Sequence, residues 1–177
     1  LMMAAIFVMT FVDRSFGPIL PLYVQSLGLG EEGVVIVSGL LFSTAAVTAA
    51  VGNQACAALL RRAPTGRVIG GGAALSAAAL ILFLSVPSVP MLMLAFAAFG
   101  AGIGTATTAA YTAGGHALPP GGQATGFGFL TGAGLAGLAV SPVVAGLMAR
   151  TSLVAIFLLD LALLAVAVVL AWMRLPG

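Results

Sequence analysis

Charged residues are scarce in this sequence, and lysine is absent from it altogether. Of the 177 residues only 6% are charged, whereas 62% are hydrophobic. A soluble domain carries about 25% charged residues, so this chain has too few to cover a water-facing surface. The composition therefore excludes an ordinary soluble domain and indicates that lipid is the main solvent of the molecule.

The small numbers of basic residues, cysteines and histidines exclude further classes of protein. The net charge of +2 comes from six arginines, which are scattered between apolar runs and form no basic face for nucleic acid. The single cysteine, Cys56, excludes an intrachain disulfide, and no cluster of metal ligands is present. The single histidine, His116, lies beside two prolines, where a surface position is expected. No metal or other cofactor is predicted.

What the sequence does contain is a series of long apolar runs. A helix that crosses a bilayer needs about 20 mostly apolar residues, and six stretches meet that need. The breaks between them hold acidic residues, arginines, or proline and glycine. We therefore predict an all-α membrane protein, a bundle of six transmembrane helices, as one domain over residues 1–177, with spans over residues 3–27, 34–59, 68–86, 90–115, 124–148 and 152–173.

The arginines predict how this bundle is oriented. Arg61, Arg62 and Arg67 lie in the second break and share a side with the terminal Arg174, whereas only Arg150 lies in a break on the other side. Because cytoplasmic segments carry the excess of positive charge, both ends of the chain are expected in the cytoplasm. Arginine without lysine, together with abundant alanine and glycine, indicates a bacterial gene and hence the bacterial inner membrane. A chain that begins on Leu1 is also expected to be a fragment.

Two charges near the middle of the first span are the strongest functional candidates. A charge at the centre of a spanning helix costs about 2.5–3.5 kcal/mol on insertion scales, so Asp13 and Arg14 should face a wet path or a partner. Adjacent side chains point about 100° apart on a helix, so we expect the two to have different neighbours. Either they contact an ion or substrate, or they form structural ion pairs with other helices.

The prolines of the same span and the glycines of the fifth are candidates for bending and packing. Pro18 and Pro21 are expected to kink or interrupt the first helix, as a hinge or as a fixed bend. In the fifth span, Gly128-x-x-x-Gly132 is a pattern of close helix packing, and Pro142 predicts a bend.

Polar residues in the second and fourth spans form two further stripes. Thr44, Thr48 and Gly52 follow one another at intervals of four, and they either line a pathway or let helices approach closely. Gly100-x-x-x-Gly104 precedes Thr105, Thr108 and Thr112, whose hydroxyl groups either face a cavity beside Tyr111 or bond to their own helix. In the sixth span Asp160 stands alone. Either it titrates, because burial favours its neutral form, or it has a structural role as a partner of Arg14 or as a neutral acid.

Several of these segments resemble a known family. Residues 13–24 (DRSFGPILPLYV) resemble the seventh helix of drug-proton antiporters of the major facilitator superfamily. Residues 52–67 (GNQACAALLRRAPTGR) occupy the place of the family's cytoplasmic loop motif, although its aspartate is missing. Ser141-Pro142-x-x-x-Gly146 resembles a weaker form of the antiporter Gly-Pro motif.

The resemblance covers the whole chain and implies the C-terminal six-helix half of a transporter, which would work with an N-terminal six-helix half. It also implies that the first and fourth spans line the central cavity, which favours Arg14 and Tyr111 over Asp160. We therefore expect a secondary transporter, a proton-coupled exporter of small molecules that works by alternating access. An inert or partner-dependent membrane fragment is the alternative. An intramembrane enzyme is the least favoured, because no protease motif is present.

Overall fold

Six long helices make up the computed structural model, which describes residues 1–85 and 88–174. No strand occurs in these ranges, so the predicted class, a bundle of six apolar helices, is confirmed. The helices are α1 (Met2–Gln25), α2 (Glu31–Leu60), α3 (Thr65–Ser85), α4 (Val89–His116), α5 (Gln123–Ala149) and α6 (Leu153–Arg174).

Local chemistry explains several helix ends. Glu31 and Glu32 lie in the first turn of α2, where negative charge stabilises the exposed N–H groups. Pro90 lies in the first turn of α4, where a missing N–H costs nothing. The turn before α2 and the turn before α5 each hold a glycine with positive φ, Gly28 at 80° and Gly121 at 86°.

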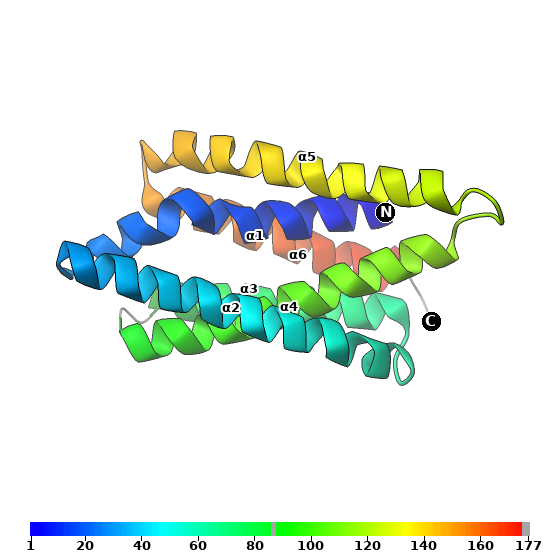
Figure 1. Ribbon diagram of the computed structural model, residues 1–177, viewed down its shortest axis with the longest axis horizontal. Helices are drawn as coiled ribbons and strands as arrows, with labels where there is room; N and C mark the ends of the chain where they lie inside the picture. Colours follow the sequence, from blue (N-terminus) through cyan, green and yellow to red (C-terminus); the bar gives the residue numbers. More distant parts are fainter. Residues whose placement is uncertain (86–87, 175–177) are drawn as a thin grey trace.

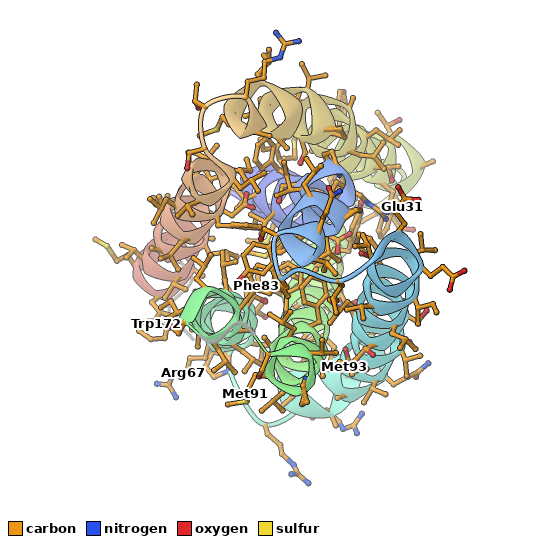
Figure 2. All side chains as sticks on the ribbon, turned by 90° about the vertical axis from the view of Figure 1, so that its left-hand side faces the viewer. Glu31, Arg67, Phe83, Met91, Met93 and Trp172 are labelled. Atoms are coloured by element: carbon orange, nitrogen blue, oxygen red, sulfur yellow. The ribbon has the colours of Figure 1, made fainter. Side chains whose placement is uncertain are left out.

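Because the six helices alternate in direction, the two chain ends lie toward the same end of the bundle (Figure 1). The turn between α2 and α3 lies at that end too, and the turn between α1 and α2 lies at the opposite end. Figure 2, a view from the opposite end, shows α1 near the centre of the bundle. In the same view Glu31, Arg67 and Trp172 lie on its outside.

The helices pack mainly in pairs that are not neighbours in the chain. Helix α1 packs against α5, α2 packs against α4, and α3 packs against both α4 and α6. Figure 1 accordingly shows α1, α5 and α6 in one half of the bundle and α2, α3 and α4 in the other.

An aromatic cluster joins the two groups. The ring of Phe16 on α1 lies 5.5 Å from that of Phe157 on α6, 5.9 Å from Phe83 on α3 and 4.8 Å from Phe99 on α4. All four side chains are buried. Contacts between such rings contribute about 0.5–1.5 kcal/mol beyond the burial of area, so the cluster fixes the middle of α1 against three other helices.

Small residues set the distance between α2 and α4. A Cβ atom on Gly100 or Gly104 of α4 would overlap a carbonyl oxygen of α2, from Ala45 and Ala49 respectively. A Cβ atom on Gly52 of α2 would likewise overlap the carbonyl oxygen of Ala101. The backbones can approach this closely only because these positions lack side chains. Gly52 therefore serves packing, one of the two roles expected for the second span's stripe.

The prolines do not interrupt their helices. Helix α1 continues through Pro18 and Pro21, and α5 continues through Pro142. Of the two expected effects on the first helix, an interruption does not occur, because the N–H groups lost at the prolines leave the other hydrogen bonds of the helix in place. The predicted bend stays a prediction. Pro18 and Pro142 are exposed and Pro21 is half-buried.

Candidate functional site

Asp13 and Arg14 form an ion pair with each other in the middle of α1. Arg14 Nε lies 3.3 Å from Asp13 Oδ2, and the side chains are 38% (Asp13) and 56% (Arg14) exposed. The expectation that they would have different neighbours was therefore wrong. Although their Cβ atoms point apart, the long arginine side chain folds back onto the adjacent carboxylate, its nearest source of negative charge.

The pair lies on the wall of a cavity between α1 and α2. This cavity has a volume of about 450 Å³, which falls within the range of small-molecule sites, about 300–1,000 Å³. Apart from the ion pair, its wall is apolar and made of small residues and one aromatic ring. The lining residues are Asp13, Arg14, Gly17, Phe42, Ala45, Ala46 and Ala49.

A dipolar pair on an apolar wall can contact a charged or polar group on an otherwise apolar molecule. The positive guanidinium group and the negative carboxylate lie side by side, so the wall offers both signs of charge within one helical turn. Because half of each side chain remains exposed, neither charge is fully neutralised by protein contacts. This combination suits amphipathic molecules better than purely apolar ones.

Thr44 and Thr48 lie on α2 close to this cavity but are not part of its lining. The Thr48 hydroxyl group donates to main-chain carbonyl oxygens of its own helix, those of Thr44 at 2.9 Å and Ala45 at 3.1 Å. Thr48 Oγ1 also occupies the space that a Cβ atom on Gly100 would need. Of the two roles expected for this stripe, the contacts of Thr48 support packing.

A polar contact joins α2 and α4 beyond the cavity, toward the end of the bundle that holds the chain termini. The Asn53 side chain lies 2.9 Å from Thr108 Oγ1. With its amide nitrogen turned toward α4, Asn53 donates to Thr108 and to the Gly104 carbonyl oxygen at 2.8 Å. Beside it, the Thr105 hydroxyl group lies 3.2 Å from the Gly52 carbonyl oxygen. Thr108 is thus tied to the neighbouring helix, while Thr112 bonds to its own.

Tyr111 lies where α4 meets α1 and α5, and it is half-buried. A Cβ atom on Gly134 of α5 would lie 3.1 Å from the Tyr111 hydroxyl oxygen and 3.6 Å from Thr10 Oγ1 of α1. The phenol group therefore lies near a junction of three helices and does not line the cavity that holds the ion pair. The structure brings Asp13 and Arg14 together but places Tyr111 apart from them.

The glycines that pack α5 onto α1 are not the predicted ones. A Cβ atom on Gly128 or Gly132 would meet nothing within 4 Å among the described residues, whereas one on Gly137 would lie 2.6 Å from the Phe7 carbonyl oxygen. Gly132 therefore makes no close helix contact among the described residues, and its packing role stays a prediction. Gly132 is exposed because its face of α5 points away from the rest of the chain, while Gly134 and Gly137 face α1.

The arginines of the predicted cytoplasmic loop are exposed. Arg61 and Arg62 follow the end of α2, and Arg67 lies in the first turn of α3. These residues lie at the end of the bundle that holds both chain ends (Figure 1). His116, at the end of α4, is also exposed, as expected.

Asp160 is buried in the interior of the bundle and does not contact Arg14. Its side chain has no exposed surface, and its Oδ2 atom lies 2.5 Å from Ser15 Oγ on α1. The ion pair between Asp160 and Arg14, one of the predicted alternatives, is therefore not formed. Sequence reasoning missed Ser15, yet a signal existed: Val12, Ser15, Phe16 and Ile19 share one face of α1, and all are buried.

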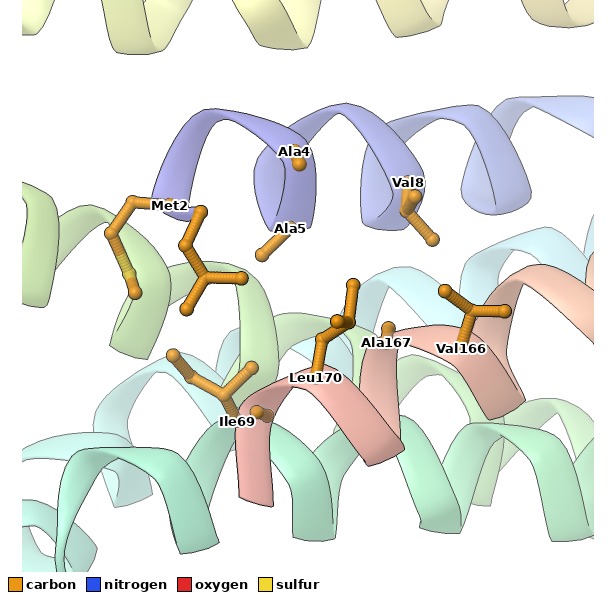
Figure 3. Close-up of a pocket in the computed structure, with 10 residues that line it drawn as sticks. Met2, Ala4, Ala5, Val8, Ile69, Val166, Ala167 and Leu170 are labelled. Atoms are coloured by element: carbon orange, nitrogen blue, oxygen red, sulfur yellow. The ribbon is translucent and has the colours of Figure 1, made fainter. Parts of the chain in front are cut away.

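A second pocket lies between the ends of α1, α3 and α6 (Figure 3). Its volume is only about 40 Å³, and apolar side chains such as Val8, Ile69 and Leu170 line it. None of the predicted site residues belongs to it. It is too small for a substrate.

Six helices of this apolarity define a multi-pass membrane protein, and a cavity lined by two charged residues lies between two of them. A comparison with protein-family models matches residues 2–177 to the Major Facilitator Superfamily. The chain therefore belongs to the Major Facilitator Superfamily, whose members are secondary transporters and not enzymes. No curated protein matches the chain.

Proposed function

We propose that this chain is the cavity-lining, C-terminal-type half of a proton-coupled exporter of small amphipathic molecules. The observation that carries the proposal is the Asp13–Arg14 ion pair on the wall of the 450 Å³ cavity. A charge in mid-membrane is costly and is retained mainly where it faces a partner, water or a transported molecule. Here both charges face the cavity.

Alternating access requires a second body that closes the cavity from the other side. The proposed partner is an N-terminal six-helix half, packed on the face formed by α1, α2 and α5. The low burial of α2 and α5 supports this arrangement, because most of their apolar side chains point outward from the bundle. Lipid would cover the remaining outward face, which includes α6.

The orientation follows from the charges. We place Arg61, Arg62 and Arg67 on the cytoplasmic side of the membrane. The first and last described residues of the chain then lie on that side too. On the opposite, outer side lie Glu31, Glu32 and Arg150. The proposed location is the inner membrane of a bacterium. Under this orientation the prolines of α1 lie in its outer half, where a small change of bend would open or close the cavity to the outside.

Vesicles reconstituted with this chain together with its proposed N-terminal six-helix half test the transport proposal. The probe is ethidium, an amphipathic cation, and the measurement is its uptake into vesicles under an imposed proton gradient. We expect uptake that depends on the gradient in the unmodified protein and a loss of at least about 90% in Arg14→Ala, because the substrate-facing charge is gone. Arg150→Ala, in the turn between α5 and α6, is the matched control and should transport normally.

Two results would contradict the proposal. Uptake by Arg14→Ala at the rate of the unmodified protein, at equal amounts of inserted protein, would remove the ion pair from the pathway. Absence of gradient-dependent uptake for ethidium and for a panel of other amphipathic ions would favour the alternative, a membrane fragment without transport of its own.

A further inference from the structure

Asp160 on α6 is an acidic side chain buried in the apolar interior and separate from the cavity. None of its side-chain surface is exposed. Its Oδ2 atom lies 2.5 Å from Ser15 Oγ, and its Oδ1 atom has no hydrogen-bond partner among the described residues. An ionised carboxylate in such a place would be among the costliest groups in the molecule.

Among the side chains that the structure describes, no positive charge is placed to balance it. On α1, which carries Ser15, the guanidinium group of Arg14 is paired with Asp13 and half exposed on the cavity side. Helix α5 contains no charged residue. The titratable Tyr23 of α1, near the aromatic cluster, donates its hydroxyl hydrogen to the Phe83 carbonyl oxygen at 3.4 Å.

The remaining arginines near α6 are too far away. On α3, the charged residue is Arg67. Trp172 of α6 lies against Gly70 of α3. Arg67 is therefore level with the C-terminal end of α6, which is about 18 Å along that helix from Asp160. Arg150 is exposed in the turn before α6, and Leu153, the first residue of that helix, already lies about 10 Å along its axis from Asp160. Neither Arg67 nor Arg150 can reach the carboxyl group.

The hydrogen bonds of Ser15 decide where a proton must be. Ser15 Oγ lies 2.9 Å from the Val12 carbonyl oxygen and 2.5 Å from Asp160 Oδ2. A serine hydroxyl group has one hydrogen to donate, and both neighbours would be acceptors if Asp160 were ionised. The two short contacts are satisfied together when Asp160 Oδ2 carries a proton and donates it to Ser15 Oγ, while Ser15 donates to Val12.

We propose that Asp160 is a proton-binding site, and that its bound proton ties α6 to the middle of α1 through Ser15. In this neutral state Oδ1 is a carbonyl oxygen without a donor, which costs far less than an unpaired charge. Loss of the proton would leave an unbalanced charge beside the aromatic cluster and break the donation to Ser15. Because Ser15 directly follows Arg14, the proton on Asp160 is linked to the position of the segment that lines the cavity.

This assignment does not depend on the proposed transport activity, since it concerns how the bundle packs. Infrared spectroscopy tests it directly, because a protonated carboxylic acid has a C=O stretching band that a carboxylate lacks. The sample is the protein in lipid nanodiscs near pH 7, with and without aspartate labelled by ¹³C at the side-chain carboxyl carbon. The chain contains two aspartates, Asp13 and Asp160, and the label separates both from the glutamates.

The expected result is a carboxylic acid band that shifts with the label, is lost in Asp160→Asn and is kept in Asp13→Asn. Asp160→Asn retains a donor toward Ser15 and should fold. If Asp160→Asn does not fold, the labelled Asp13→Asn variant still decides the assignment. A label-sensitive band that persists in this variant can come only from Asp160, the other aspartate of the chain. Ser15→Ala should shift the band, because the carboxyl group loses its acceptor. A label-sensitive band that is absent near pH 7, or lost in Asp13→Asn, would overturn the proposal.

Discussion

Ser141 on α5 donates a hydrogen bond of 2.6 Å to the main-chain carbonyl oxygen of Phe11 on α1. Ser141 has no exposed surface, and Phe11 is 4% exposed. The bond lies one turn beyond Gly137, where the two backbones approach most closely. It therefore fixes α5 against α1 two residues before Asp13, the first residue of the ion pair.

Ser141→Ala is expected to weaken this helix pair. Hydrogen bonds between membrane helices contribute about 0.6–1.7 kcal/mol, so the free energy of unfolding should fall by about 1 kcal/mol. Unfolding in mixed detergent micelles measures it. Ser85→Ala is the matched control, because among the described residues its hydroxyl group bonds to the Ile81 carbonyl oxygen of its own helix and to no other helix. Equal losses in the two variants would show that the contact with Phe11 adds nothing.

Gly100→Val should prevent α4 from packing on α2. A side chain at Gly100 would overlap the Ala45 carbonyl oxygen, which belongs to a helix backbone and cannot move alone. Overpacking costs about 1–3 kcal/mol and often more, so we expect little folded protein in the membrane fraction. Gly71→Val on α3 is the control, since a Cβ atom there meets nothing within 4 Å among the described residues. Normal amounts of folded Gly100→Val would contradict the close packing.

A double-mutant cycle on Asn53 and Thr108 should detect the polar contact between α2 and α4. The two side chains lie 2.9 Å apart, and Asn53 also reaches the Gly104 carbonyl oxygen. Asn53→Ala should therefore cost more stability than Thr108→Val. The coupling energy should be about 0.6 kcal/mol, the average for such pairs in a membrane bundle. Additive effects of the two substitutions would show that the contact does not form.

The number and type of the helices could be predicted from the sequence. Each span is an apolar run long enough to cross a bilayer, and the turns between them hold residues that avoid hydrocarbon, such as Glu31 or Arg61, or that favour turns, such as Gly121. These signals come from single segments and do not depend on how the helices meet. The six-helix bundle was therefore correct before any contact was known.

The faces of the helices were much harder to predict. In a soluble helix the buried face is apolar and the exposed face polar, but a membrane helix is apolar on both, because lipid is as apolar as a protein interior. Nothing local distinguishes Gly132, which faces outward, from Gly137, which packs on α1. The pairing of Asp13 with Arg14 depends on a flexible arginine side chain, and the contact between Ser15 and Asp160 joins residues 145 positions apart.

The cavity itself can be tested by its access to water. Cys56 is 1% exposed, so the unmodified chain should react little with a charged maleimide that cannot enter lipid. Ala46→Cys places a thiol group on the cavity wall beside the ion pair. We expect it to react at least about ten times faster than the unmodified chain, because thiolate forms readily only where water is present.

Leu158→Cys is the control for that experiment, because Leu158 is 55% exposed on α6, on the face proposed to contact lipid. Its thiol group is exposed to lipid but not to water, so it stays protonated and a charged maleimide should modify it slowly. Similar rates for Ala46→Cys and Leu158→Cys with the charged reagent would mean that the cavity is filled by lipid or by protein. Asp13 and Arg14 would then not face water, and their exposure would have to be explained by contact with a partner helix.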